Sequence, residues 1–476
     1  MLFNGGAVLI DRVSVEHRQF YPQPGWVEHD PEEIIRNTYK SVQLLLAKSN
    51  VSPSDIVSLA ITNQRETVMV WDRRTGKPVY NAIVWQCNRG AKLCEELIAG
   101  GHEPTVKRKT GLVLDPYFSA SGVKWILDNV QGASQAARDG HLLMGTMDSW
   151  LVWNLTVGKV HATDYTNASR TLLFNIHSLD WDKELTDLFT IPPPMLPKAL
   201  PSDGTFGTTT INGLLPEIPI AGVLGDSHGA LVGQMCFSSG MGKATYGTGS
   251  SIMVNIGDKA LPPPRGLVTS IGFAARGEVF FVFEGNIHCT GATIKWMQDE
   301  LELIHSAAET EALAKSVEGT DGVYLVPAFA GLGAPWWDHA AKALICGMNR
   351  GTRKAHIIRA ALEAIAYQVK DLLSVIQQSG IEIRELRVDG GPVRNNFLMQ
   401  FQSDILQIRI IRSAIEEASA LGAIVMNGFA LGKWADFKEV TALRPQDNPI
   451  LPTMPPAQVD ALYEGWKTAV QRALFK

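Results

Sequence analysis

Short apolar runs alternate along this chain with longer segments in which apolar residues recur at helical spacing. Runs of this length predict buried strands, and the helical spacing predicts amphipathic helices. Repeated alternation of the two is typical of an α/β protein, here with parallel and antiparallel strands mixed. The expected strands lie at residues 59–62, 218–224, 252–256, 279–283, 323–327 and 386–388, and the clearest expected helices at 356–373 and 419–431.

The length of the chain indicates two domains. Its 476 residues, 45% of them hydrophobic, exceed the size of about 250–300 residues at which a single core stops growing. A glycine-rich tract at residues 225–249 has the composition of a crossover between two halves. We therefore expect an N-terminal domain over residues 1–235 and a C-terminal domain over residues 236–476.

Charge and cysteine content exclude several classes of function. The formal net charge is −5 and neither sign of charge forms a long run, so nucleic acid and anionic membranes are not expected partners. The five cysteines are scattered without metal-ligand spacing, which is typical of buried thiols in a reducing compartment. Because the sequence shows neither an apolar segment of about 18 residues nor a basic leader, we expect a soluble, cytoplasmic protein.

Arg65, Glu66 and Trp85 form a candidate polyol pocket. A carboxylate accepts hydrogen bonds from neighbouring hydroxyl groups, a guanidinium donates to hydroxyl oxygens, and an indole ring covers the C–H face of a carbon chain. An adjacent arginine and glutamate after an apolar run also fit the solvated end of a strand. The three residues by themselves leave both interpretations open.

Asp226 is the candidate for the group that orients and deprotonates an attacking hydroxyl. It lies in the segment VLGDSHGAL, between an apolar strand and the start of a helix rich in small residues, where a carboxylate can face a cleft. The same position also suits the N-cap of a helix that begins at Ser227. On these residues alone, both interpretations stay open.

Three glycine-containing turns are candidates for binding phosphate groups. The turn YGTG at residues 246–249 lets backbone N–H groups approach an anion, and the Thr248 hydroxyl is a further donor. Similar turns occur at residues 290–292 and 389–391. Each turn alone fits an ordinary connection equally well, but their joint occurrence in this order indicates a nucleotide site.

Seven segments spread along the chain carry further motifs. They are SLAITNQRET, YNAIVWQC, TGLVLDPYFSASGVKWILDN, TDYTNASRTLLFNIHSLDWD, YGTG, VPAFAGLGAPWWD and RVDGGPVRNNFLMQFQSDIL. In these motifs the chain resembles the FGGY carbohydrate kinase family. Residues 343–363 fit the C-terminal signature of that family at every position, and YFSASGVKWILDN fits the other signature except at Gly122. The resemblance implies two ribonuclease H-like domains of the actin-like ATPase superfamily that flank a cleft.

The resemblance also implies an activity and a set of site residues. The expected reaction is the Mg-ATP-dependent transfer of a phosphoryl group to a terminal hydroxyl of glycerol, with Asp226 as the catalytic base. Glycerol and ATP are then the partners of a homo-oligomer, and Mg²⁺ is the metal, with no ligand assigned to it. The residues expected to contact the polyol are Arg65, Glu66, Trp85, Tyr117, Asp226, Ser227 and Ser251, and those expected to contact ATP are Thr248, Gly291, Lys295, Gly391 and Asn395. On sequence alone, Tyr117 suits a core aromatic residue equally well.

Two positions depart from the family and leave the acceptor open. Ser227 stands where glutamine is usual, and Ser251 stands where the family has a phenylalanine packed against the carbons of glycerol. A smaller and more polar wall leaves room for another hydroxyl group or a water. A kinase for a larger polyol or a ketose is therefore the alternative within the same class.

The start of the sequence is the largest departure. The chain begins MLFNGGAVLIDRVSVEHRQF and matches the family only after its first strand and a phosphate-binding turn of the type DxGTTSSR. We therefore expect an N-terminally truncated chain that lacks this strand and the first phosphate-binding loop. Two explanations stay open: a start upstream of Met1, or a shortened homologue without catalysis that binds a polyol or a partner protein.

Overall fold

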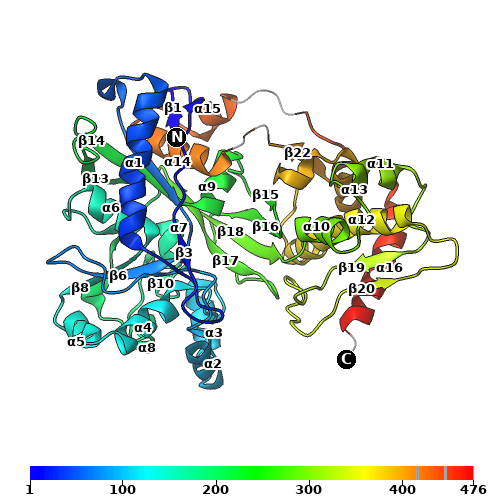
Figure 1. Cartoon of the computed structure of the whole chain (residues 1–476), viewed down its shortest axis with the longest axis horizontal. Helices are drawn as coiled ribbons and strands as arrows, with labels where there is room; N and C mark the ends of the chain where they lie inside the picture. The colour runs from blue at the N-terminus through cyan, green and yellow to red at the C-terminus, as the bar shows by residue number, and fades with distance from the viewer. Residues whose placement is uncertain (414, 416, 444–447, 475–476) are drawn as a thin grey trace.

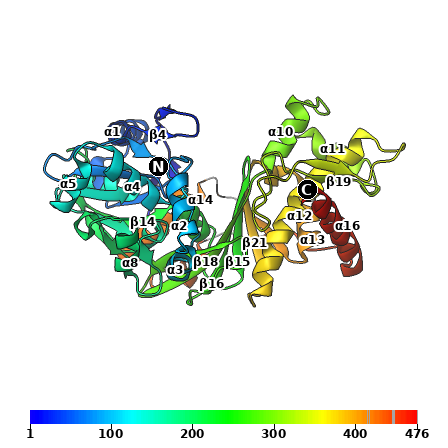
Figure 2. The ribbon, with the colours of Figure 1, turned by 90° about the horizontal axis from the view of Figure 1, so that it is seen from below.

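The chain folds into two lobes that lie side by side (Figure 1). The computed structural model describes residues 1–413, 415, 417–443 and 448–474. Helix α1 and the strands up to β14 lie in the N-terminal lobe, and helices α10 to α13 and α16 lie in the C-terminal lobe. Strands β15 to β18 run from one lobe toward the other, as the two views in Figures 1 and 2 both show.

The first half of the chain supplies the elements of the N-terminal lobe. Its strands are β1 (Leu2–Phe3), β2 (Leu9–Asp11), β3 (Gln19–Phe20), β4 (Glu28–His29), β5 (Leu59–Asn63), β6 (Val68–Asp72), β7 (Ala82–Ile83), β8 (Leu142–Thr146), β9 (Ala162–Asp164), β10 (Phe174–Asn175), β11 (Asp180–Trp181), β12 (Lys198–Leu200), β13 (Thr205–Thr209) and β14 (Ile218–Gly225). Its helices are α1 (Pro31–Ser49), η1 (Pro53–Asp55), α2 (Ala91–Ala99), α3 (Glu103–Thr110), α4 (Ser119–Asn129), α5 (Ala133–Arg138), α6 (Met147–Leu155), α7 (Tyr165–Ala168), α8 (Lys183–Leu188), η2 (Pro193–Met195) and α9 (Asp226–Gly233).

The second half of the chain supplies the remaining elements. Its strands are β15 (Met241–Tyr246), β16 (Ser250–Gly257), β17 (Val268–Ala275), β18 (Glu278–Ile287), β19 (Tyr324–Val326), β20 (Leu344–Cys346), β21 (Glu385–Gly390) and β22 (Arg409–Arg412). Its helices are α10 (Gly291–Asp299), α11 (Glu309–Lys315), α12 (Lys354–Gln378), η3 (Gly391–Arg394), α13 (Asn396–Leu406), α14 (Ala418–Ala430), α15 (Phe437–Ala442) and α16 (Pro456–Leu474).

The six strands and two helices expected from the apolar pattern are confirmed. The strands overlap β5, β14, β16, β18, β19 and β21, and the helices overlap α12 and α14. Parallel and antiparallel strands are mixed, as expected, since β15 pairs antiparallel with β16 and parallel with β21. None of the described helices is both long enough and apolar enough to cross a membrane.

The main sheets of the N-terminal lobe have few strands each. One has the order β3-β4-β7-β6-β8, and the other has the order β13-β14-β5. Within the described residues, β5 pairs only with β14 and β1 pairs only with β2.

Strand β14 and helix α9 determine the position of Asp226. The apolar run IPIAGVLG forms a strand between β13 and β5, and it is buried because both neighbours and helix α14 cover it. Helix α9 begins at Asp226 immediately after the extended Gly225. Because α9 carries only small and apolar residues after its first turn, it is buried between β14 and the sheet of the second half.

The six-stranded sheet β17-β18-β16-β15-β21-β22 has both faces covered. One face packs on helices α12 and α13, through residues such as Ala244, Ile252 and Leu386. The other face packs on α9 and α14, through residues such as Met253 and Val282. Burial on both sides explains why these strands are nearly continuous apolar runs in the sequence. Figure 2 shows the sheet between the two sets of helices.

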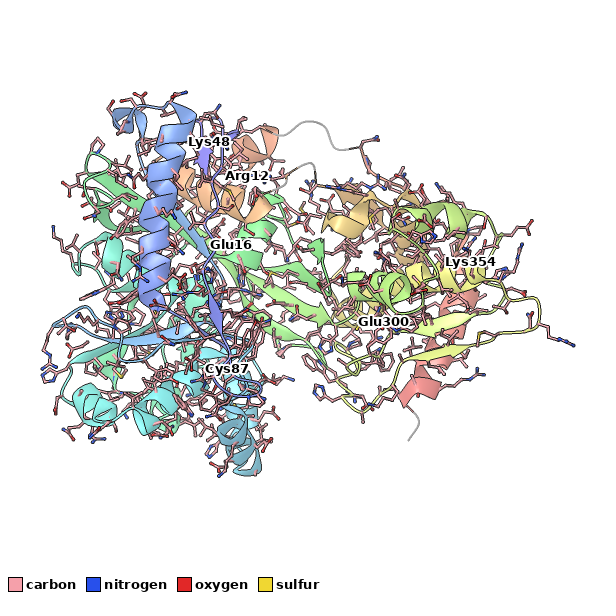
Figure 3. All side chains as sticks on the ribbon, viewed as in Figure 1. Arg12, Glu16, Lys48, Cys87, Glu300 and Lys354 are labelled. Atoms are coloured by element: carbon pink, nitrogen blue, oxygen red, sulfur yellow. The ribbon has the colours of Figure 1, made fainter. Side chains whose placement is uncertain are left out.

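Helix α14 comes late in the sequence but packs against α9, β14 and β5 of the N-terminal lobe (Figure 1). Arg12, labelled in Figure 3, adds a 2.7 Å ion pair to Glu417, immediately before α14. The backbones of α9 and α14 approach so closely that a Cβ on Gly422 of α14 would clash with the backbone of Gly229 on α9. The α9–α14 contact therefore requires glycine at this crossing.

We expect the substitution Gly422→Ala to reduce the free energy of unfolding by roughly 1–3 kcal/mol, because an added methyl group overpacks a backbone contact. Urea unfolding of the purified chain measures this change. Gly319→Ala is the matched control, since a Cβ there meets only one atom, at 3.9 Å. Equal stability of the two variants would contradict the tight α9–α14 crossing.

Candidate active site

Four charged side chains form a buried ion cluster where the two lobes meet. Both terminal nitrogens of Arg65, which follows β5, donate to the carboxylate of Glu284 on β18, at 3.0 and 2.9 Å. Arg170 completes the cluster, with 2.6 Å from its Nε to Glu66 Oε1 and 2.7 Å from its Nη1 to Glu284 Oε2. The side chains of Arg65 and Glu66 are 5% and 2% exposed, which excludes the alternative of solvated charges at a strand end.

The backbone at Glu66 is bent into the cluster. Glu66 has a φ of 61°, in the left-handed region that favours glycine. A residue with a side chain holds this conformation at a cost of about 1–3 kcal/mol, and such residues are concentrated at functional sites. The ion pair with Arg170 and the hydrogen bond from Ser119 Oγ to the Glu66 carbonyl, at 2.8 Å, hold the bend in place.

The cluster shifts the pKa values of its two carboxyl groups in opposite directions. Burial alone raises the pKa of Glu284, but Arg170 and Arg65 outweigh burial and hold this pKa below its ordinary value. For Glu66 the effect of burial is larger than that of Arg65 and Arg170, and the pKa is raised. Glu284 is therefore the group that holds a negative charge between the two arginines.

Asp226 lies at the edge of the cluster and is open to solvent. Its Oδ1 is 3.2 Å from Arg65 Nε and accepts a 2.6 Å hydrogen bond from the Ser227 N–H. The N-cap position of α9 belongs to Gly225, so the alternative of an N-cap aspartate for a helix beginning at Ser227 is wrong. With 48% of its side chain exposed, Asp226 is accessible to a hydroxyl group.

Trp85 and Tyr117 form an aromatic wall beside the cluster. Their rings meet edge to face, with centroids 5.4 Å apart. Trp85 is 37% exposed, whereas Tyr117 is more deeply placed, and burial raises the pKa of its phenol, with Glu66 adding to the rise. The guanidinium of Arg170 lies 5.9 Å from the centre of the Tyr117 ring. The structure thus brings Trp85 and Tyr117 close to Arg65 and Glu66, as the sequence predicted.

The two serines that depart from the family come from different elements of the fold. Ser227 follows Asp226 on α9, and Ser251 lies on β16 of the six-stranded sheet. Ser251 pairs in register with Asn286 on β18, and its Oγ is 3.3 Å from Lys243 Nζ. Both serines are partly exposed.

The three glycine turns meet at one end of the six-stranded sheet. The turn at 246–249 connects β15 to β16 as a hairpin, and its Thr248 carbonyl accepts hydrogen bonds from the N–H groups of Thr290 and Ala292, at 2.9 and 3.0 Å. A Cβ on Gly390, whose φ is 99°, would clash with the backbone of Tyr246. The first turn is therefore an ordinary hairpin, and it also lies directly against the other two turns.

A cavity of about 560 Å³ opens beside these turns. Four of the five residues expected at the nucleotide line it, namely Gly291, Lys295, Gly391 and Asn395. The fifth, Thr248, is not in its lining but contacts the start of α10 through its carbonyl. Apolar side chains complete the wall, among them Ile294, Leu362, Ile365 and Leu398. The cavity thus offers an apolar surface for a ring and backbone N–H groups for an anion.

A larger cavity of about 880 Å³ lies between the lobes. Ala230 and Ser419 line it from the helices α9 and α14, and Thr245 and Asp389 line it from the sheet. Asp389 Oδ2 accepts a 2.5 Å hydrogen bond from Gln234, whereas its buried Oδ1 has no hydrogen-bond partner among the residues that the structure describes. An unpaired carboxylate oxygen in a buried place is costly unless a ligand completes it.

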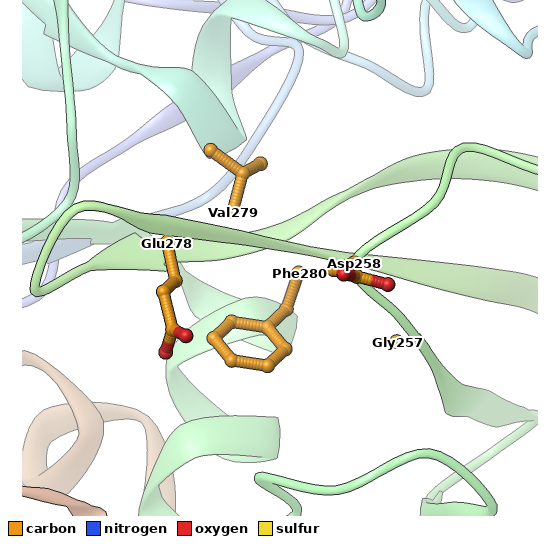
Figure 4. A pocket seen from close by; sticks show the side chains of 5 residues that line it. All are labelled: Gly257, Asp258, Glu278, Val279 and Phe280. Carbon is orange, nitrogen blue, oxygen red and sulfur yellow. The ribbon is translucent and has the colours of Figure 1, made fainter.

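Figure 4 shows a third hollow, of about 440 Å³, lined by Gly257, Asp258, Glu278, Val279 and Phe280. These residues lie at the end of β16 and the beginning of β18, whereas the glycine turns lie at the opposite ends of both strands. The hollow is therefore separate from the cluster around Asp226.

Three charged residues of the site were not predicted from the sequence. Glu284 lies inside the apolar run FVFEGNI, Arg170 follows α7, and Lys243 is a buried lysine on β15. A charge inside a run that predicts a buried strand is a detectable signal, because buried charges need partners. The partner of Glu284, however, is Arg65, more than two hundred residues away in sequence, and the sequence alone does not pair them.

Two lobes around a cavity, with an accessible carboxylate on one lobe and glycine turns on the other, define a phosphotransferase with the actin-like ATPase fold. Models of the FGGY family of carbohydrate kinases match the chain in two parts, the N-terminal domain at residues 1–233 and the C-terminal domain at residues 242–431. The chain belongs to the FGGY family of carbohydrate kinases, so the resemblance and the expected fold and enzyme class are confirmed.

Similar proteins match over nearly their whole length. Glycerol kinase 2 of Thermotoga maritima is 49% identical over 475 residues, covering 100% of this chain and 96% of that protein. Glycerol kinase of Symbiobacterium thermophilum is 51% identical over 474 residues, covering 99% and 95%. The crystal structure of Plasmodium falciparum glycerol kinase with ADP has a TM-score of 0.95 at 36% identity, covering 100% and 95%. Xylulose kinase from Lactobacillus acidophilus, at 19% identity and a TM-score of 0.88, shares the fold.

We expect Glu284→Gln to reduce the free energy of unfolding by about 3–5 kcal/mol, because two buried guanidinium groups lose their shared anion. The pKa of Glu284 lies below its ordinary value of 4.5, so its stabilising effect is present above that pH and is lost as the pH falls. Urea unfolding as a function of pH tests both effects, and the loss of stability below about pH 4.5 becomes shallower in the variant.

Glu300→Gln, at an exposed position labelled in Figure 3, is the matched control for the removal of a glutamate charge. We expect it to change stability by no more than about 0.5 kcal/mol. If Glu284→Gln were as mild as this control, the ion cluster would not hold the lobes in place.

Proposed function

We propose that this protein transfers the γ-phosphoryl group of ATP to a terminal hydroxyl group of glycerol, giving glycerol 3-phosphate and ADP. The observation that carries the proposal is the position of Asp226, which is accessible, lies 3.2 Å from a buried arginine, and heads a helix packed on the sheet that ends in the glycine turns. Relatives that are about half identical over nearly the whole chain are named glycerol kinases, which supports this acceptor.

Asp226 is the proposed base. The oxygen of the acceptor hydroxyl forms a bond to the γ-phosphorus, the bond from that phosphorus to the β,γ-bridging oxygen breaks, and ADP leaves with the electron pair. The hydroxyl proton passes to the Asp226 carboxylate, which must be within hydrogen-bond reach of it. Arg65 Nε, at 3.2 Å, keeps that carboxylate in place.

The polyol pocket is proposed to combine the ion cluster with the aromatic wall. Both terminal nitrogens of Arg65 donate to Glu284. The proposed role of Arg65 is therefore to orient Asp226 and Glu66 more than to donate to a hydroxyl group of the substrate. Glu66 accepts from hydroxyl groups, and the rings of Trp85 and Tyr117 cover the C–H face of the carbon chain. Ser227 and Ser251 form the polar edges of the pocket.

The proposed nucleotide site joins the cavity beside α10 to the three glycine turns. The apolar wall of that cavity takes the adenine ring, and Thr248, Gly291 and Gly391 lie along the phosphates, with Lys295 and Asn395 at the rim. ADP in the crystal structure of the Plasmodium falciparum relative supports a nucleotide in this fold. Closure of the lobes over both substrates excludes water and limits hydrolysis of ATP.

Mg²⁺ is proposed to bind through the phosphates of ATP together with Asp226 and Asp389. Within the described residues there is no group of three or more histidines, cysteines, aspartates or glutamates that could hold a metal by itself. Mg²⁺ usually binds through one or two carboxylates plus substrate phosphates, so these residues fit it. The unpaired Asp389 Oδ1 is the specific feature that favours this site, and a Mg²⁺ ion held there would neutralise charge on the transferred group.

Several further expectations stay predictions. The domain boundary near residue 235 lies between the two segments matched by the family models, which end at 233 and resume at 242. The homo-oligomer and the cytoplasmic location also stay predictions, and the match over 96% of the Thermotoga maritima relative gives no support to an N-terminal truncation.

We expect glycerol to stimulate ADP release from Mg-ATP by the purified 476-residue chain. Asp226→Asn removes the proton acceptor and is expected to reduce this turnover by roughly 10²–10⁴-fold. Asp258→Asn, in the hollow of Figure 4 at the far end of the sheet, is the matched control and keeps full activity. A folded chain that releases no ADP in response to glycerol would favour a non-catalytic homologue that binds a polyol or a protein.

A kinase for a larger polyol or a ketose is the second candidate function. It is favoured by the small polar side chain of Ser251 opposite Asn286, which leaves that part of the pocket wall without an aromatic ring. We expect glycerol to be phosphorylated with a higher kcat/KM than erythritol or xylulose. ADP release measured with each acceptor under the same conditions tests this order, and the reverse order would establish the second candidate.

A further inference from the structure

Lys243 is a buried lysine that has no carboxylate partner within the described residues. The residue lies in the middle of β15 and is 1% exposed. Its Nζ lies 3.3 Å from Thr245 Oγ1 and 3.3 Å from Ser251 Oγ, and it forms no ion pair within the described residues. Two hydroxyl oxygens at this distance compensate an ammonium group only weakly, and a buried charge without a close partner is costly.

The strand register places Lys243 on the face of the sheet that carries Asp226. Side chains alternate along a strand, and Ala244 and Tyr246 of β15 pack on the opposite face, against α12. Lys243 is in register with Met253, which packs against α9. Because α9 begins at Asp226, the Lys243 ammonium lies between the sheet and the helix that supplies the proposed base.

The same face links the acceptor side of the site to the phosphate side. β15 runs from Lys243 directly into the glycine turn at 246–249. Burial lowers the pKa of Lys243, and the charge of Arg65 adds to this lowering. The carboxylates act in the opposite direction: Asp389 has the largest effect, followed by Glu284 and Asp226. Lys243 thus lies in the field of the acceptor-side carboxylates and of the carboxylate proposed for Mg²⁺.

We propose that the Lys243 ammonium binds the phosphoryl group while it passes from ATP to the acceptor. The inference rests on the proposed kinase activity and assigns a further catalytic residue to it. The bonds formed and broken are those given above, and Lys243 remains protonated throughout. Its ammonium group donates to a non-bridging oxygen of the γ-phosphoryl group, where negative charge is concentrated.

The physical reason is electrostatic. Enzymes that transfer phosphoryl groups act mainly by positioning and by stabilising charge, and a fixed cation in a site closed to water is worth more than the same cation in solvent. Thr245 and Ser251 hold the ammonium group in its orientation before the nucleotide binds. The cost of a poorly compensated charge is then offset when the phosphoryl group arrives.

Lys243→Met tests the proposal, since methionine has a similar length and no charge. We expect kcat for glycerol-dependent ADP release to fall by roughly 10²–10³-fold with little change in the KM for glycerol. We expect the thermal midpoint not to fall, because removal of an unpaired buried charge breaks no ion pair. Lys370→Met is the matched control. Lys370 is half-buried, its Nζ donates to the Ile405 carbonyl of the C-terminal lobe, and kcat should not change in this variant.

Chemical rescue separates catalysis from a structural role. In Lys243→Ala, added methylammonium or ethylammonium should enter the space of the missing side chain and restore kcat at least tenfold, whereas the same amines should not restore Asp226→Asn. A lower thermal midpoint in Lys243→Met together with no amine rescue would overturn the proposal in favour of a structural lysine.

The remaining outcomes distinguish the two proposals. If the unmodified chain releases ADP in response to glycerol and Lys243→Met does so equally well, the assignment of Lys243 is wrong and the kinase activity stands. If the unmodified chain shows no glycerol-dependent release, both the proposed function and the role of Lys243 are overturned.

Discussion

The buried ion cluster of Arg65, Glu66, Arg170 and Glu284 is the interaction on which the site depends. Three of its members come from the N-terminal lobe and Glu284 comes from the sheet of the second half, so the cluster joins the two halves of the chain. Taking charges out of water is expensive, and the cost is recovered only when the geometry is good and every charge has a partner. The positions of β5 and β18 are therefore coupled, and Asp226 lies where they meet.

The difference between the two faces of the six-stranded sheet explains how a largely apolar sheet carries polar side chains of the site. One face contributes only to the core, whereas the other packs on α9 and α14 and also carries Lys243, Thr245 and Ser251. Successive side chains of β15 and β16 point to opposite faces of the sheet. Polar side chains of the site and buried apolar side chains can therefore occupy neighbouring positions in the same strand. Because the three glycine turns lie at the ends of strands in this one sheet, the acceptor side and the nucleotide side share one rigid support.

Much of this arrangement could be predicted from the sequence, and the remainder has identifiable causes. The strand before Asp226, the helix after it, and the turns at 246–249 and 290–292 follow from local patterns of apolar residues and glycine, which act over a few residues. The partners of Arg65 and Glu66 could not be predicted, because Glu284 and Arg170 are distant from them in sequence and the pairing depends on how the lobes pack. The return of α14 to the N-terminal lobe was missed for the same reason.

By itself, the sequence determined the α/β class, the family, the position of Asp226 at a strand-to-helix junction, and the order of the glycine turns. These features depend on short-range periodicity, on the conformational freedom of glycine and on motifs, which are all local properties of the chain. Only the tertiary structure decided that Arg65 and Glu66 are buried rather than solvated and that Asp226 is accessible. It also decided that Lys243 lies on the sheet face packed against α9, without a carboxylate partner within the described residues. Burial and charge pairing depend on packing between segments hundreds of residues apart, and no local pattern contains that information.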